Sequence, residues 1–277
     1  KNTMGYGMNS FIDFDEPVKI LEHLMVGSEG TLGFVAEATF RTVPVRPKTA
    51  TGFLLFNSME AATDALPVLV NSGADVVELL DSASILAMGE DARSVLPANL
   101  QVTGQASLLV EYQGDTDDEL ADRSREGFAR FADFDLYADP EMTQDPARRE
   151  QMWTMRKGLY TKIAWNRPKG TAALLEDVAV PMERLGSVCS ELQVLFDKHN
   201  YEGAVIFGHA KDGNIHFLVT EDFDGPVSMK RYEDFTEDMV QLVLDRQGTL
   251  KAEHGTGRIM AWYNSSPYCR CTNGAMM

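Results

Sequence analysis

Apolar residues recur along the chain with two different periods, and the changes of period predict the secondary structure. Short stretches rich in β-branched and aromatic residues predict strands, whereas longer stretches with apolar residues every three or four positions predict helices. From residue 51 the pattern predicts, in order, a strand at 51–56, a helix at 58–71, a strand at 75–80, a short helix and loop, a strand at 106–112, a helix at 116–131 and a strand at 134–138. That order corresponds to the split β-α-β unit of ferredoxin-like folds.

A second, similar series follows a long helical segment. Residues 140–165 have helical spacing, with Met152, Met155, Leu159 and Ile163 on one face. The later pattern predicts a strand at 172–180, a helix at 181–198, strands at 203–209 and 214–220, and a helix at 227–247. We therefore expect an α+β fold in which helices cover one face of an antiparallel sheet, so that the other face or an end of the sheet can receive a ligand.

The beginning and the end of the chain do not continue this pattern. Residues 25–35 form a glycine-dense loop that runs into a predicted strand, and Pro44 and Pro47 then interrupt the periodicity. Residues 259–277 have no usable periodicity and contain an Asn-Ser-Ser-Pro turn cluster. We therefore divide the chain into a first part at 1–47, a main domain at 48–258, and an altered or disordered tail at 259–277.

Composition argues against several classes of protein. The chain has 277 residues and a formal net charge of −17, which disfavours a nucleic-acid surface because phosphate binding needs clustered Lys and Arg. No apolar run approaches the roughly 18 residues that an integral membrane segment needs. Cys189 stands alone in the body of the chain, and the other two cysteines are in the last residues, so no disulfide framework is implied. These features favour a reducing compartment such as the cytoplasm.

The strongest chemical signal is the segment Gly-His-Ala-Lys-Asp-Gly-Asn-Ile-His at residues 208–216. An Asp-Gly pair between apolar stretches is typical of a two-residue hairpin turn, because Gly supplies the positive φ of a type I′ turn. With Asp212 and Gly213 in the turn, His209 lies directly opposite His216, and cross-strand neighbours have Cβ atoms roughly 5 Å apart. Two imidazoles can then converge on one ion. An ordinary cross-strand histidine pair is the structural alternative.

A third ligand can come from the segment Glu-His-Gly-Thr-Gly-Arg at residues 253–258, where either Glu253 or His254 is suitable. Two histidines and a carboxylate with a position left open suit a catalytic divalent cation such as Zn²⁺ or Mn²⁺ better than a closed structural site. A third motif, Gly-Ser-Glu-Gly-Thr-Leu-Gly at residues 27–33, allows the backbone to approach a ligand closely, although a tight turn before a strand would also need these glycines.

These three motifs, in this order, resemble the flavin-dependent D-2-hydroxy acid dehydrogenases of the vanillyl-alcohol-oxidase superfamily. The group includes D-lactate, glycolate and D-2-hydroxyglutarate dehydrogenases, and the resemblance covers residues 1 to about 258. Residues 176–181, Glu-Asp-Val-Ala-Val-Pro, fit the family's strand that leads into a helix of the substrate domain. The resemblance implies that residues 1–47 are the C-terminal part of an FAD-binding domain and that residues 48–258 are the substrate domain.

The resemblance also implies roles for individual residues. His209, His216 and Glu253 would bind the divalent ion, and His254 would be the general base that takes the hydroxyl proton while hydride passes to FAD. Arg156 would bind the substrate carboxylate, with a solvated helix arginine as the alternative. Asn214 would lie near the flavin, at the tip of the histidine ribbon, which is the hairpin that carries His209 and His216. The residues implied to contact FAD are Gly27, Ser28, Glu29, Gly30, Thr31 and Gly33.

Some features depart from the family or extend the expectation. Tyr160 stands where dicarboxylate-specific members have Thr, and their strand lysine falls near Leu175, which puts a second substrate carboxylate in doubt. The family's pyrophosphate-binding loops lie upstream of the first residue here. We therefore expect a piece of a longer protein, inactive and without FAD when isolated. The sequence of residues 251–258 resembles a long bacterial type of this family, which carries an iron–sulfur module and can be peripheral to the membrane.

Two other functions are compatible with parts of this pattern. A flavin-independent metallohydrolase would use the same histidines and Glu253 to activate water. A non-catalytic, ligand-binding domain of ferredoxin-like shape is the second alternative, because such folds have many functions. The glycine motif at residues 27–33 favours the oxidoreductase, since a hydrolase has no need for it.

Overall fold

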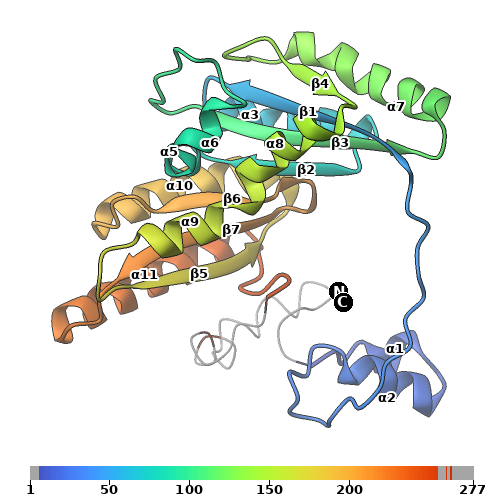
Figure 1. Ribbon diagram of the computed structural model, residues 1–277. Helices are drawn as coiled ribbons and strands as arrows, with labels where there is room; N and C mark the ends of the chain where they lie inside the picture. The colour runs from blue at the N-terminus through green and yellow to red at the C-terminus, as the bar shows by residue number, and fades with distance from the viewer. Residues whose placement is uncertain (1–5, 255–259, 261–262, 264–277) are drawn as a thin grey trace.

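The computed structural model describes residues 6–254, 260 and 263, and its centre is one seven-stranded antiparallel sheet (Figure 1). The strand order is β4-β1-β3-β2-β6-β7-β5. The strands are β1 (Lys48–Phe56), β2 (Val76–Leu80), β3 (Ala106–Gly114), β4 (Glu141–Thr143), β5 (Ala172–Ala179), β6 (Val205–His209) and β7 (Asn214–Glu221). The first half of the sheet joins the second through β2 and β6, where Glu78 pairs with His209. The expected α+β class with two similar halves is confirmed.

Helices cover both faces of this sheet, whereas the sequence predicted helices on one face. The helices that pack on one face are α3 (Met59–Asp64), α4 (Leu66–Asn71), α7 (Asp117–Arg130), α10 (Leu185–Lys198) and α11 (Pro226–Asp245). Those on the other face are α5 (Ser82–Met88), α6 (Glu90–Arg93), α8 (Pro146–Lys157) and α9 (Leu159–Asn166). Adjacent residues of β1 explain this, since Phe53 and Leu54 are both buried and belong to opposite clusters.

The predicted helical face of residues 140–165 is confirmed, but the segment contains two helices. Met152, Met155 and Leu159 are fully buried, and α8 ends at Lys157, with Gly158 between it and α9. The predicted helix at 58–71 is likewise split into α3 and α4, because Pro67 in the first turn of α4 cannot donate a backbone hydrogen bond.

The predicted strand at 134–138 is wrong. Residues Phe131–Asp133 form a 3₁₀ helix, and Leu136 makes one isolated bridge with Phe56. The alternating apolar residues Phe134 and Leu136 pack against the core without a ladder of hydrogen bonds. The edge position beside β1 is taken instead by β4, where Thr143 pairs with Thr51.

The N-terminal part contains α1 (Ser10–Asp13) and α2 (Pro17–Met25), which are joined to β1 by an extended stretch (Figure 1). The prediction of a strand after Gly33 is wrong. Residues 34–46 are in no strand and pair with none of the described strands. Phe34 is 91 % exposed in this stretch. Most of the tail at 259–277 lies outside the described residues. No helix in the described part of the chain is long and apolar enough to cross a membrane.

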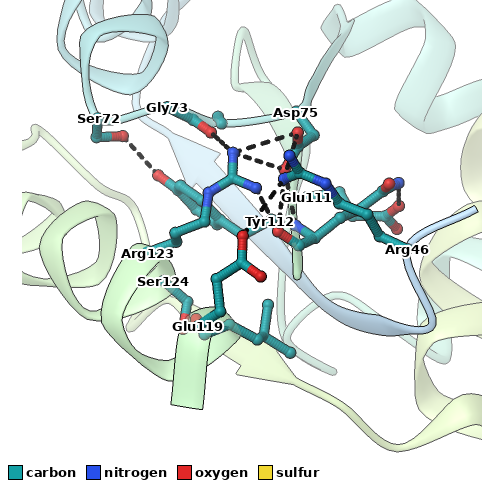
Figure 2. A network of polar contacts seen from close by, with 12 residues as sticks. Arg46, Ser72, Gly73, Asp75, Glu111, Tyr112, Glu119, Arg123 and Ser124 are labelled. Atoms are coloured by element: carbon teal, nitrogen blue, oxygen red, sulfur yellow. Dashed lines mark hydrogen bonds and ion pairs between the residues drawn. The ribbon is translucent and has the colours of Figure 1, made fainter. Parts of the chain in front are cut away.

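A polar network fixes the start of β2 (Figure 2). Arg123 of α7 donates to the carbonyl oxygen of Gly73 at 2.9 Å and forms an ion pair of 3.2 Å with Asp75. The Asp75 carboxylate also accepts the backbone N–H of Gln113 at 2.7 Å. Lys211, from the turn between β6 and β7, donates to the carbonyl oxygen of Ala74 at 2.7 Å. The histidine ribbon is therefore attached to the same corner of the sheet.

Candidate metal and substrate site

The turn between β6 and β7 is longer than the sequence predicted, and this changes the register. His216 pairs with Phe207, not with His209. The reason is that Ala210–Asp212 form a 3₁₀ turn and Gly213 takes a left-handed φ of 66°, so four residues make the connection instead of two. The predicted direct pairing of the two histidines is wrong, but their rings are still perpendicular neighbours with centroids 5.3 Å apart.

The three predicted metal ligands lie together. The Nε2 atoms of His209 and His216 lie 3.0 Å and 3.2 Å from the same oxygen, Oε1 of Glu253. One ligand atom from each residue lies within 4.8 Å of the other two, which is the spacing needed to hold a single cation. This arrangement comes from three elements that are far apart in sequence: the end of β6, the start of β7 and the loop after α11.

Each histidine also has a carboxylate beside its other nitrogen. Nδ1 of His209 lies 2.6 Å from Oε1 of Glu78, and Nδ1 of His216 lies 3.2 Å from Oδ1 of Asp177. The Nδ1 of His216 is buried and has no well-aligned hydrogen-bond partner among the described residues. A histidine whose second nitrogen faces a carboxylate has a fixed ring orientation and a more basic ligand nitrogen, as in metal sites. The residues present therefore fit a divalent cation.

Glu78, which the sequence analysis missed, connects His209 with Arg156. The second oxygen of Glu78 accepts a hydrogen bond of 2.6 Å from Nε of Arg156. Burial alone would raise the pKa of Glu78, but His209 and Arg156 outweigh it and lower that pKa, while the hydrogen bond with Glu78 raises the pKa of His209. The Arg156 side chain is 16 % exposed and lies over the ring of Phe207, so it is not a solvated helix arginine.

Asp177 is the second functional residue that the sequence analysis missed, although it lies inside the motif at residues 176–181. It is 5 % exposed on β5, and its carboxylate accepts hydrogen bonds from Asn214 and from the backbone around Glu253. Burial would raise its pKa, but the contacts with His216, His254 and Asn214 hold it well below the usual range. The available signal was a pair of acids, Glu176 and Asp177, in an otherwise apolar strand.

The structure places Asn214 and His254 beside this centre. Asn214 is buried and donates through Nδ2 to Asp177 at 2.7 Å and to the carbonyl oxygen of Val178 at 2.9 Å. The His254 ring stacks on His216 with centroids 4.9 Å apart and an angle of 10° between the planes. Its side chain is 45 % exposed, so it is accessible to a substrate.

The glycine loop at residues 27–33 approaches the same region from the N-terminal part. Gly27 and Gly30 have φ of 79° and 78°, which makes a side chain unfavourable at both positions. Glu29 lies 2.5 Å from Nζ of Lys251, two residues before Glu253. A cavity of about 450 Å³ lined by α3 and α4 lies on the opposite face of the sheet and contains none of these groups.

The antiparallel α+β domain thus brings two histidines, a carboxylate and a neighbouring arginine together around the end of β6 and the start of β7. Residues 46–266 match the family described as FAD linked oxidases, C-terminal domain, and the chain belongs to this family. The resemblance to flavin-dependent 2-hydroxy acid dehydrogenases expected from the three motifs is thereby confirmed at the level of the family.

Two curated relatives are similar to this chain in sequence. The chain is 29 % identical over 243 residues to a probable mitochondrial D-lactate dehydrogenase of Danio rerio, covering 86 % of this chain and 46 % of the relative. It is 29 % identical over 249 residues to the glycolate oxidase subunit GlcD of Escherichia coli K12, covering 88 % of this chain and 47 % of that protein. The chain thus spans about half the length of these relatives.

Solved structures support the fold. An alkyldihydroxyacetonephosphate synthase superposes with a TM-score of 0.60 at 13 % identity, covering 83 % of this chain and 45 % of that one. A p-cresol methylhydroxylase superposes with a TM-score of 0.53 at 10 % identity, covering 84 % of this chain and 50 % of that one. At these identities the likeness concerns the architecture alone.

Proposed function

We propose that this chain forms the substrate domain of an FAD-dependent oxidoreductase that oxidises a D-2-hydroxy acid to the 2-oxo acid. In this proposal His209, His216 and Glu253 hold a divalent cation, Zn²⁺ or Mn²⁺. The observation that carries it is the convergence of both Nε2 atoms on one Glu253 oxygen, 3.0 Å and 3.2 Å away, while both Nδ1 atoms face carboxylates. Membership of the FAD-linked oxidases favours the redox reaction over the hydrolysis that the same side chains could catalyse.

A divalent cation held by His209, His216 and Glu253 would lower the pKa of the substrate hydroxyl, and bound FAD would supply the hydride acceptor. His254 then takes the hydroxyl proton on its imidazole, since its accessible ring lies against His216, next to the cation ligands. The segment at residues 27–33 contributes to the FAD side of the site, with the remaining contacts supplied by other parts of the protein. The iron–sulfur module of the long bacterial type remains an expectation.

Arg156 binds the substrate carboxylate in this proposal. Within the described residues its hydrogen bond to Glu78 uses Nε, so both terminal nitrogens can donate to the two oxygens of a carboxylate. Because Glu78 holds both Arg156 and His209, the carboxylate and the hydroxyl of one 2-hydroxy acid can be bound side by side. Asn214 contributes by holding Asp177, and its contact with substrate or flavin stays a prediction.

The decisive experiment is anaerobic flavin reduction in the FAD-loaded longer protein that we expect to contain this chain, followed by stopped-flow absorbance with D- and L-2-hydroxy acids. We expect reduction by a D-isomer and a loss of roughly 10²–10⁴ in rate for His254→Ala, which is the usual contribution of a general base. His23→Ala removes an exposed histidine of α2 outside the cluster and should keep the wild-type rate. Reduction by no 2-hydroxy acid would refute the proposed reaction, and an unimpaired His254→Ala would refute the base.

A further inference from the structure

Asp177 makes an unusual set of contacts with the loop that carries Glu253 and His254. Its Oδ2 atom accepts three consecutive backbone N–H groups, from Ala252 at 3.2 Å, Glu253 at 2.7 Å and His254 at 2.6 Å. Its Oδ1 atom accepts the side-chain amide of Asn214 at 2.7 Å. One buried carboxylate therefore binds both the loop and the start of β7.

The loop that carries Glu253 and His254 lies outside the regular secondary structure. Thr249 forms an isolated bridge with Ala179, and residues 250–254 are in neither a helix nor a strand. Within the described part of the chain, the backbone N–H groups of residues 252–254 donate to Asp177 and to no backbone carbonyl. Hydrogen bonds to an ionised acceptor are stronger than neutral ones. The backbone that brings Glu253 to the histidines is thus bound to this carboxylate at three consecutive residues.

Asp177 also pairs with His216 in the sheet register, so the same residue adjoins the ribbon and the loop. Its carboxylate lies 3.2 Å from Nδ1 of His216, on the side of the ring opposite the nitrogen that faces Glu253. Asp177 could itself be considered a cation ligand, because it clusters with His216 and His254. Its two oxygens, however, already accept four hydrogen bonds, which leaves it better suited to hold ligands than to be one.

We propose that Asp177 is the positioning residue that assembles the site, by holding the loop of residues 252–254 so that Glu253 and His254 reach the ribbon together. The importance of this role for catalysis rests on the proposed function. The effect of Asp177 on the loop conformation does not depend on that function. Asp177→Asn would keep the shape of the side chain. Its amide would present N–H donors to a site filled with N–H donors, so it could not satisfy all of them.

The first test measures Mn²⁺ affinity by calorimetry for the wild type, Asp177→Asn, Glu253→Ala and the double variant. Asp177→Asn should weaken binding by roughly 10–100-fold, as loss of an outer-shell carboxylate does. In the Glu253→Ala background the same change should have a much smaller effect, because the ligand it positions is gone. Equal effects in both backgrounds would overturn the proposal, since Asp177 would then act without Glu253. His216→Ala tests the cation site itself: tight binding unaffected by His216→Ala would refute that site but not the role of Asp177.

The second test needs no metal. Amide hydrogen exchange at residues 252–254 should accelerate at least about tenfold in metal-free Asp177→Asn, while amides of β1 and β3 stay protected. Asp75→Asn is the matched control, because it removes another carboxylate that accepts a backbone N–H, in the network of Figure 2. If Asp177→Asn does not fold, Asp177→Glu keeps the charge but displaces it, and exchange at 252–254 should still rise. Unchanged exchange at these amides in a folded variant would overturn the proposal.

Discussion

At the scale of single residues, the site depends on carboxylates that do not themselves face the proposed substrate. Glu78 is 4 % exposed and lies 2.6 Å from both Nδ1 of His209 and Nε of Arg156. A buried carboxylate is tolerated here because two hydrogen-bonding cationic or polar partners compensate its desolvation. The two functional side chains therefore depend on the same charge.

Glu78→Gln should weaken metal binding by roughly 10–100-fold. The amide oxygen can still accept from Arg156, which turns the amide NH₂ toward Nδ1 of His209. That contact makes Nδ1 an acceptor and puts the ring proton on Nε2, the atom that should bind the cation. Calorimetric titration with Zn²⁺ and Mn²⁺ measures the change.

Glu111→Gln is the matched control for Glu78→Gln. Glu111 is also buried on the α8 side of the sheet, where it accepts hydrogen bonds from Trp153 and Arg149 but from no histidine. Its substitution should lower stability and leave metal affinity unchanged. A similar loss of affinity in both variants would show that the effect of Glu78 is a general consequence of removing a buried charge.

The sequence pattern pointed to the three proposed metal ligands, which the structure brings together, but not to the carboxylates that contact them. His209, His216 and Glu253 lie in short glycine-containing motifs, which are visible without a structure. Glu78 is the one acid of β2, and Asp177 follows Glu176 in β5, so neither lies in a distinctive motif of its own. Their proposed roles follow only from the pairing of β2 with β6 and of β5 with β7. Such long-range pairings are not encoded in local periodicity.

At the scale of elements, the periodicity of apolar residues predicted the positions of most strands, whereas the register of the β6–β7 hairpin was predicted wrongly. The strands β1, β2, β3, β5, β6 and β7 lie where the alternation predicted them, within a few residues. The hairpin register was wrong because a 3₁₀ turn over Ala210–Asp212 competes with the two-residue turn that the Asp-Gly pair favours. The error shifted the pairing by two residues, which keeps His209 and His216 on the same face of the ribbon.

The junction between β2 and α5 predicts a pH dependence. Asp81 caps α5 by accepting the backbone N–H of Ser84 at 2.8 Å, and it is 2 % exposed. Burial raises the pKa of Asp81 from 3.8 to about 6, although hydrogen bonds with Ser84 act in the opposite direction. The folded protein then holds this proton more tightly than the unfolded chain, so its stability falls as pH rises from about 4 to 6.

Asp81→Asn should remove this part of the pH dependence. Asn caps a helix about as well as Asp but does not titrate, so the variant should be more stable than the wild type at pH 7 by about 1–3 kcal/mol. Near pH 4 the difference should be small, because the wild-type carboxyl is then protonated in the folded state. Urea denaturation of both proteins at the two pH values measures it. A difference that does not change with pH would contradict the prediction.

At the scale of the whole molecule, one sheet domain contains every group of the proposed metal site. The ligands and the carboxylates behind them lie between β2 and residue 254. The predicted boundary at residue 47 immediately precedes β1, which begins at Lys48. The N-terminal part touches the site loop through Glu29 and Lys251, an ion pair that is partly exposed and worth about 1 kcal/mol or less. The sheet domain should therefore keep its structure without the N-terminal part.

Brief digestion with trypsin tests this boundary. Residues 33–46 are in no helix or strand, and among the described residues their backbone makes no backbone–backbone hydrogen bond, so Arg41 should be cleaved before sites within the sheet domain. Mass spectrometry should identify a product that begins at Thr42. The affinity of this product for Zn²⁺ or Mn²⁺ should be within about threefold of that of the intact chain. Arg41→Gln should abolish this cut, because it removes the residue that trypsin recognises. Arg46 cannot replace it, since it is followed by Pro47 and resists trypsin. Earlier cleavage inside residues 48–254, or loss of metal binding on cleavage after Arg41, would show that the N-terminal part is integral to the domain that carries the site.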